Sequence, residues 1–263
     1  CALPISLFSK VEDLYIKEIY NYNLLHLSIH ILGFTRETIG RKLEIKDKAI
    51  KRNPRNSFTK KVVSSEKLMD FAQEYFGCNK TNISGIELEE LKEAEYQCND
   101  DYIHWDSRIL SGEIMTAGIY VQDQVISEFT LIALEETGFY KTNKFTGGLM
   151  RFGKHAGCDF FNIDCNEALP ENNKTTKSKT LFENEFCSGP RKTTCSPGRQ
   201  SRGSCEIEVT SSKVGLYKED FYIRDWENYG NKYADFCPLS LNEDESKVSE
   251  KYSYIGNCRY GTR

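Results

Sequence analysis

The pattern of apolar and polar positions predicts a long helix near the start of the chain. Ser9 and Glu12 form a capping-box pair, and apolar residues then recur at helical spacing as far as Leu32. In the second half of this segment, apolar residues lie on nearly every face, which predicts that this half is buried. Gly33 follows the last apolar residue and can end the helix. We therefore expect a helix over residues 9–33.

The same periodicity predicts two more helices. One begins at Ser65 and ends at Phe76, with its apolar residues on one stripe and Gly77 after it. The other is expected over residues 120–138 and is stopped by Gly138. Its apolar face would consist of Val125, Phe129, Ile132 and Ala133.

Residues 35–62, the basic segment, have a different character. They hold ten Lys or Arg residues against three acidic residues, and neither a helical nor a strand period runs through them. We interpret the segment as an exposed excursion. It is either a solvated face or a surface for an acidic partner.

Composition narrows the class of protein. The 263 residues are 39% apolar, and no apolar run approaches the roughly 18 residues that a membrane-spanning helix needs. A formal net charge of −4 with mixed signs disfavours a nucleic-acid binder. Ten Cys without a C-x-x-C pair, seven of them between residues 158 and 258, favour disulfides over a zinc ribbon.

These features predict export. Disulfides need an oxidising compartment, so we expect a secreted, cell-surface or luminal glycoprotein. The chain opens at Cys1 without Met, and we expect that an export signal was removed upstream. Three N-x-S/T sequons, at Asn79, Asn82 and Asn173, agree with export, although each alone is a weak signal.

The chain has four His residues, and two of them stand four apart in the first predicted helix. That spacing places His26 and His30 on one face, within reach of a single metal ion. The alternative is a structural role, but two buried imidazoles without a shared partner would be costly. The spacing alone leaves both interpretations open. His104 is ambiguous at this point, Met115 is interpreted as a buried Met, and His155 as a surface-loop residue.

Residues 26–34 read HLSIHILGF and resemble the zinc helix of the leishmanolysin-type metzincin peptidases, which carry H-E-x-x-H-A-L-G-F there. In that family a long insertion separates this helix from the third His ligand, and here the gap runs from Gly33 to His104. Residues 104–115 are similar to the family's third-ligand and Met-turn segment. Shorter family-like blocks follow in the same order: EYFGC at 74–78, GFY at 138–140, AGCDF at 156–160, and DFCP at 235–238, similar to the family's D-Y-C-P.

The resemblance implies an α+β fold in two parts. Residues 1–157 would be the C-terminal part of a metzincin catalytic domain, mostly helical, and residues 158–263 a loop-rich, disulfide-stapled module. Within the first part it implies a zinc helix over 9–33, a long insertion over 34–103, the third His and Met-turn over 104–118, and a helix over 120–138.

It also implies that His26, His30 and His104 bind zinc, with Met115 in the turn beneath the metal. One position departs from the family, because Leu27 stands where the family has the Glu that acts as general base. Leucine can neither accept a proton nor supply a charge, so we assign no catalytic residue.

Other carboxylates near His104 in sequence are candidates for a replacement base. Asp101, Asp106 and Glu113 are close to it in the chain, but none stands beside His26 on the helix. Local turn and loop contacts explain all three better.

The resemblance further implies a set of disulfide bonds, although sequence alone cannot fix connectivity. The expected pairs are Cys78–Cys158, Cys165–Cys237, Cys187–Cys205 and Cys195–Cys258. Cys1 and Cys98 are left over, and they either pair with each other or Cys1 bonds to an upstream segment.

We therefore expect an exported leishmanolysin-like pseudo-peptidase that acts as a structural or interaction subunit, with zinc as its cofactor. The alternative is an active zinc endopeptidase with an altered catalytic base, and a third hypothesis is an adhesion module that uses the basic segment. Residues 1–25 cannot supply the sheet subdomain that precedes the zinc helix in the family. We therefore expect a protein partner or an upstream segment of the same protein, and no nucleic acid.

Overall fold

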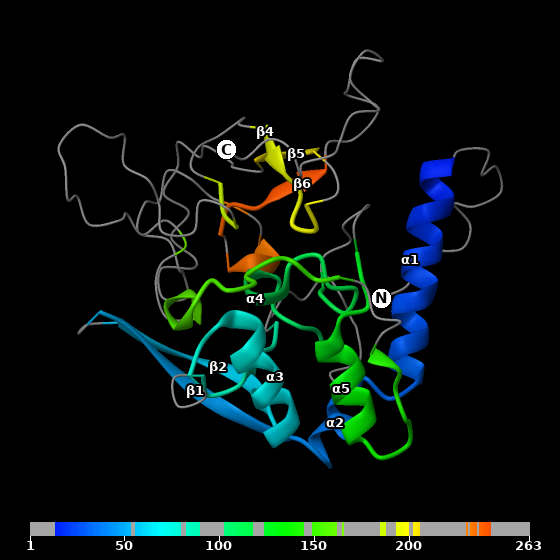
Figure 1. Ribbon diagram of the computed structural model, residues 1–263, viewed down its shortest axis with the longest axis vertical. Helices are drawn as coiled ribbons and strands as arrows, with labels where there is room; N and C mark the ends of the chain where they lie inside the picture. Colours follow the sequence, from blue (N-terminus) through cyan, green and yellow to red (C-terminus); the bar gives the residue numbers. More distant parts are fainter. Residues whose placement is uncertain are drawn as a thin grey trace.

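The structure is a computed structural model, and its described residues form helices and two three-stranded sheets (Figure 1). The structure describes residues 14–53, 56–79, 83–89, 103–117, 124–144, 149–161, 165, 185–187, 193–199, 202–205, 230, 232–235 and 237–242. This mixture of helices and strands, joined by three disulfides, agrees with the expected α+β class.

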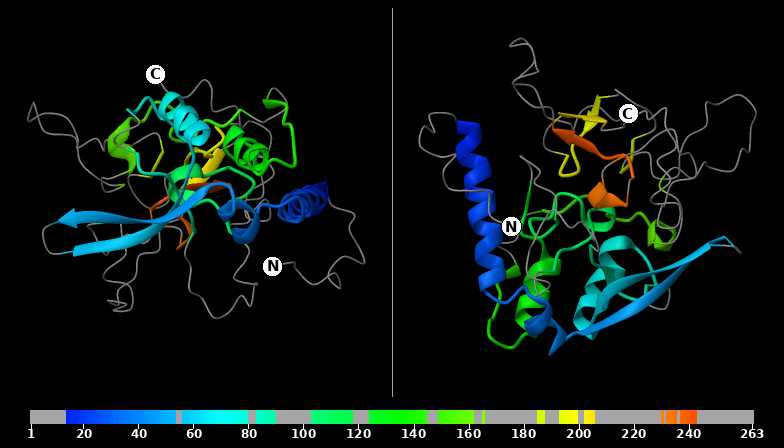
Figure 2. Two further views of the ribbon diagram at one scale, coloured as in Figure 1. Left: turned by 90° about the horizontal axis from the view of Figure 1, so that it is seen from below. Right: turned by 180° about the vertical axis from the view of Figure 1, so that it is seen from behind.

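Helix α1 (Leu14–Ile31) lies at one edge of the molecule, far from the tip of the hairpin formed by strands β1 and β2 (Figures 1 and 2). Its predicted end is confirmed, because Gly33 takes φ +112° and the amide of Phe34 donates to the carbonyl of Ile29. The predicted capping pair lies outside the described residues.

The expected burial of the second half of α1 was wrong. Ile29 and His30 are buried, but Leu24 is 52% exposed and Ile31 is 84% exposed. Only one stripe of the helix packs against the rest of the fold, so apolar residues on its other faces are exposed.

The basic segment is regular structure, which corrects the expected excursion. Thr35 caps the short helix α2 (Arg36–Gly40). The strands β1 (Glu44–Asn53) and β2 (Asn56–Ser64) then form an antiparallel hairpin, and β3 (Ile86–Glu87) pairs with β2. The sequence does not show the alternation of apolar and polar residues that is typical of a strand, because lysines occupy some of the inward-facing positions.

Helix α3 (Glu66–Phe76) matches its prediction at both ends. The side chain of Ser65 accepts from the amide of Leu68, and Gly77 adopts the left-handed conformation at φ +65°. The helix lies over the hairpin and packs on α5 (Glu128–Glu136), where its aromatic residues meet Phe129 (Figure 1).

Helix α5 is shorter than predicted. It begins at Glu128, and residues 124–127 are not helical. Val125 does not join the helical face; its amide donates to the carbonyl of Gly112, and its carbonyl accepts from Ile114. The main-chain N–H and C=O of Val125 are therefore paired with the turn at residues 111–115 and do not take part in the helix.

The C-terminal part contributes short elements. These are η4 (Cys158–Phe161), η5 (Lys232–Ala234) and a second sheet of β4 (Thr193–Cys195), β5 (Arg202–Cys205) and β6 (Ser240–Asn242). No helix in the described ranges is long and apolar enough to cross a bilayer.

Three of the expected disulfides are confirmed, and they are Cys78–Cys158, Cys165–Cys237 and Cys187–Cys205. The fourth expected pair involves Cys258, and the leftover pair involves Cys1 and Cys98. These three residues lie outside the described part of the chain. Disulfides of this kind are typical of proteins from an oxidising compartment.

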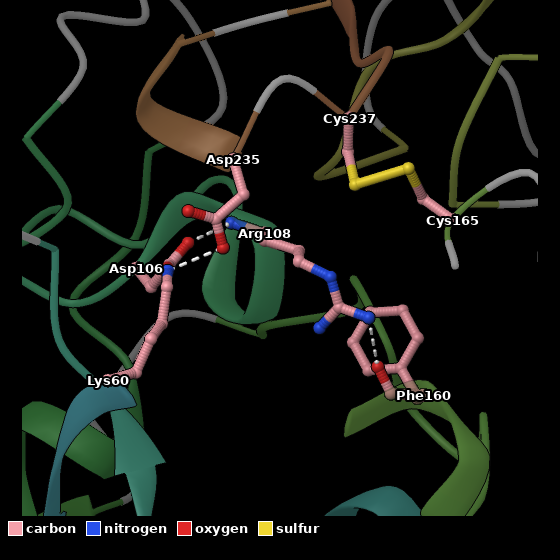
Figure 3. Close-up of a disulfide and its surroundings, with 7 residues drawn as sticks. All are labelled: Lys60, Asp106, Arg108, Phe160, Cys165, Asp235 and Cys237. Atoms are coloured by element: carbon pink, nitrogen blue, oxygen red, sulfur yellow. Dashed lines mark hydrogen bonds and ion pairs between the residues drawn. A yellow bond between two sulfur atoms is a disulfide. The ribbon is translucent and has the colours of Figure 1, made fainter. Parts of the chain in front are cut away.

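A buried lysine joins the hairpin, the segment after His104 and the C-terminal part (Figure 3). Lys60, 5% exposed, donates from Nζ to carboxylate oxygens of Asp106 and Asp235. Burial alone would lower the pKa of Lys60, but the two aspartates hold it well above its usual range. A second ion pair beside it joins Lys48 to the fully buried Glu87 at 3.1 Å.

We expect Lys60→Met to lower the free energy of unfolding by about 3–5 kcal/mol, because it leaves two buried carboxylates without their cation. Its neighbour Lys61 is the matched control. Lys61 pairs with Asp47 on the surface, so Lys61→Met should cost about 0–1 kcal/mol. Denaturant unfolding under non-reducing conditions measures both variants, and equal losses would contradict this role for Lys60.

Candidate metal centre

Two histidines of α1 form one side of the site. They are four residues apart, so both rings lie on the helix face turned toward the core. His30 is 4% exposed and His26 is half-buried. Their ring centroids are 4.7 Å apart at an interplanar angle of 80°.

His104 comes from an extended segment that is hydrogen-bonded on both sides. On one side, its carbonyl accepts from the amide of Glu89 at 3.0 Å, next to β3. On the other side, the amide of Trp105 donates to the carbonyl of Met115 at 2.9 Å. The third imidazole is therefore placed by main-chain pairing and brought against the helix from 74 residues away.

The three imidazoles converge through equivalent atoms. Nε2 of His26 lies 3.2 Å from Nε2 of His104 and 3.1 Å from Nε2 of His30. Nε2 of His30 and Nε2 of His104 are also 3.2 Å apart. Tetrahedral ligands at about 2.0–2.1 Å from zinc would be about 3.3–3.4 Å apart. The predicted residues thus form a triangle of the size that one such ion requires.

The opposite ring nitrogens explain why the Nε2 atoms face inward. Nδ1 of His26 lies 2.6 Å from the carbonyl of Ile114, and Nδ1 of His30 lies 2.8 Å from the carbonyl of Phe34. A carbonyl only accepts, so each Nδ1 carries the proton and each Nε2 presents a lone pair. Lone pairs that face one another at this distance suit a shared cation, so these residues fit a metal ion.

Burial keeps these rings in the form that binds metals. It lowers the pKa of His26, lowers that of His30 to about 4, and lowers that of His104 well below its usual value. Backbone hydrogen bonds raise the first two in part. All three imidazoles are therefore neutral at neutral pH, which is the ligating state.

Met115 lies fully buried in the turn formed by residues 111–115, the Met-turn segment. The turn touches the site through Ile114, whose carbonyl contacts His26. His155, the remaining histidine, is exposed at φ 60° in a separate turn, as its interpretation as a surface residue predicted.

Leu27, at the position where the resemblance predicts a general base, is half-buried on the same helix. Of the alternative bases, Asp106 is bound by Lys60 and caps α4 (Ser107–Leu110) through the amide of Arg108. Glu113 accepts hydrogen bonds from Met115, Ser127 and Thr130. Asp101 lies outside the described residues.

Burial raises the pKa of Glu113 to about 7, and its hydrogen bonds from Thr130, Ser127 and Met115 oppose this shift. Neither Glu113 nor Asp106 belongs to the His cluster that could hold an ion. Among the described residues, that cluster has imidazole ligands and no carboxylate.

A second cluster was not foreseen from the sequence. Glu87, Asp106 and Asp235 bring carboxylates within 4.8 Å of one another. Lys48 and Lys60 supply cations there, so the group forms a buried ion-pair network. Its members are far apart in the chain, and no local sequence signal connects them.

The two histidines of α1 and the histidine beside the turn at residues 111–115 form a cluster that could hold one metal ion. Comparison with known proteins agrees: the sequence profile of the Leishmanolysin family matches residues 9–253. The chain therefore belongs to the leishmanolysin family.

Individual relatives show the same likeness. A leishmanolysin-like peptidase of Caenorhabditis elegans is 31% identical over 209 residues, which are 72% of this chain and 29% of the relative. One of Drosophila melanogaster is 29% identical over 62% of this chain and 24% of its own length. The leishmanolysin of Leishmania tropica is 26% identical over 86% and 32%, respectively. The chain thus spans about a third or less of these curated relatives.

We expect the purified chain to bind about one zinc ion, and His26→Ala, His30→Ala or His104→Ala each to abolish stoichiometric binding, because a tetrahedral centre needs three protein ligands here. His155→Ala is the matched control and should retain the metal. Elemental analysis after dialysis measures all four variants. Natural protein without zinc, or retention by the three site variants, would contradict the expectation.

Proposed function

We propose that this chain is a zinc-binding, non-catalytic member of the leishmanolysin family that acts through contacts with another polypeptide. The observation that carries the proposal is the combination of three converging imidazoles with a leucine between two of them on α1. Such a site would bind a metal ion through its histidines but would lack the side chain that peptide hydrolysis needs.

The missing step is a proton transfer. Zinc, when bound, polarises a carbonyl group and makes water more acidic. The chain must still take up a proton from the attacking water and deliver one to the departing amine. The side chain of Leu27 contains only carbon and hydrogen and does neither, and loss of such a group typically costs about 10²–10⁴-fold in rate.

An apolar stripe of α1 that includes Leu27 supports an interaction role. Tyr20, Leu24, Leu27 and Ile31 are spaced four, three and four residues apart, so they form one stripe along the helix. Tyr20 is 45% exposed, Leu24 and Ile31 more so, and Leu27 completes the stripe. A glutamate at position 27 would interrupt it, so leucine fits a contact surface better than a catalytic cleft. The occupant would be a protein partner or another segment of the same protein.

Secretion, cell-surface display or residence in a luminal compartment belongs to the same proposal. The three disulfides support it, and so does the exposed position of Asn79, the first sequon asparagine. The other two sequon asparagines lie outside the described residues.

An active zinc endopeptidase is the alternative, and one observation favours it. The pKa of Glu113 is raised to about 7, a range that suits a general base. Its carboxylate is, however, occupied by hydrogen bonds from Met115, Ser127 and Thr130 and does not belong to the His cluster. The hypothesis of an adhesion module with a basic surface is weakened, because Lys48 and Lys60 are taken up by buried ion pairs.

We expect the longest natural form of the protein, loaded with zinc, to show no cleavage of a generic peptide library. Leu27→Glu should gain chelator-sensitive cleavage, by about 10²–10⁴-fold over any residual rate, because it restores the proton acceptor. Leu27→Gln is the matched control: it is similar in size but has no basic carboxylate, and it should stay inactive. Mass spectrometry of the digests measures all three proteins.

Chelator-sensitive cleavage by the natural protein would overturn the pseudo-peptidase proposal. If neither the natural protein nor Leu27→Glu cleaves, Leu27 is not the main cause of inactivity, and that part of the proposal fails.

We expect the stripe on α1 to be covered in the natural assembly. Hydroxyl-radical footprinting should therefore oxidise Leu24 and Ile31 several-fold more slowly in protein isolated from its source than in the separate chain. Phe139 and Leu149, which are 72% and 60% exposed on other segments, serve as internal controls with similar rates in both samples. Equal oxidation of the stripe in both samples would exclude a covered surface there.

A further inference from the structure

Glu113 is a buried carboxylate outside the three-histidine cluster whose hydrogen-bond partners are all defined. Its side chain is fully buried, yet it accepts from the amide of Met115, the amide of Ser127 at 3.1 Å, the hydroxyl of Ser127 at 3.0 Å and the hydroxyl of Thr130 at 2.6 Å. An ionised carboxylate can accept all four. Such a complete set of donors holds the carboxylate in one orientation.

These contacts join two pieces of chain. Met115 belongs to the Met-turn segment, whereas Ser127 and Thr130 belong to the start of α5. The carboxylate lies at the N-terminal end of that helix, where the helix dipole favours negative charge. Main-chain bonds join Gly112 and Ile114 to Val125, and the side chain of Glu113 adds further hydrogen bonds between the two pieces.

The same carboxylate reaches the third histidine's segment through one intermediate. The indole Nε1 of Trp105 donates to the hydroxyl of Thr130 at 2.9 Å, and that hydroxyl donates to Glu113. Trp105 is fully buried and follows His104 directly. The hydrogen-bond direction is therefore fixed from Trp105 through Thr130 to Glu113.

The turn held in this way contacts a site histidine. The carbonyl of Ile114, between Glu113 and Met115, accepts from Nδ1 of His26 at 2.6 Å. That single contact determines which nitrogen of His26 is protonated and how the ring is turned. His30 has an independent arrangement, because its Nδ1 bonds to Phe34 on its own side of the site.

We propose that Glu113 is a positioning residue for the three-histidine centre. By tying the Met-turn segment to α5, it sets the Ile114 carbonyl that keeps His26 in the Nδ1–H form with Nε2 toward the metal. The role rests on the proposed metal binding for its purpose, but its effect on His26 exists without metal.

The test is Glu113→Gln. The amide NH2 of Gln replaces one carboxylate oxygen, so a donor would then face the donors of Met115, Ser127 or Thr130. Nitrogen-15 NMR of metal-free protein at neutral pH should show that His26 loses its single Nδ1–H tautomer while His30 keeps it. Zinc affinity, measured by competition with a chelator, should fall about 10–100-fold, the range found for outer-shell partners of metal ligands. A purely structural role would change stability without this selective effect on His26.

Glu136→Gln is the matched control. Glu136 is a half-buried carboxylate at the other end of α5 that accepts from Ser65, so it should leave His26 and zinc affinity unchanged. A Glu113→Gln protein that behaves like Glu136→Gln would overturn the proposal. If Glu113→Gln does not fold, Ser127→Ala decides, because it removes one donor and should shift His26 in the same direction by a smaller amount; an unchanged His26 there also overturns it.

The two proposals fail in different ways. If the natural protein binds no zinc but the His26 tautomer depends on Glu113, the metal-binding function is wrong and the positioning role holds. If zinc binds and His26 ignores Glu113, the positioning role is wrong.

Discussion

The site depends on the main-chain pairing of one short extended segment, residues 103–106. On one side this segment bonds to the strand around Glu87 and Glu89, and on the other to Met115. It presents His104 to α1, buries Trp105 completely, and places Asp106 against Lys60. A shift of the segment would disturb the third imidazole, the Met-turn segment and the buried ion pair together.

The sequence predicted those parts of the fold whose signals are local. Helix α3 has a capping serine at one end and a left-handed glycine at the other, and both act within a few residues of the chain. The pair His26 and His30 was found for the same reason, because helical spacing alone brings them together. His104 could be added only through resemblance to a family, since nothing in its own neighbourhood identifies it as a ligand.

Parts that depend on distant partners could not be predicted. The hairpin could not be predicted because Lys60 points inward although lysine is typical of a surface. Its partners Asp106 and Asp235 lie 46 and 175 residues further along the chain. Val125 was placed in a helix because its strand-like partner is the turn near Gly112. Similarly, Glu113 was weighed only as a base, and its four donors became visible only when α5 was placed beside the turn.

The two carbonyls behind His26 and His30 belong to the main chain, and this has an evolutionary consequence. Almost any residue at position 34 or 114 still offers a carbonyl oxygen, so no single codon change removes these supports. The general base of the family, in contrast, is one side chain at one position. The orientation of the two rings is therefore inherited with the backbone path, whereas the ligands themselves, like the base, are single side chains that one substitution can remove.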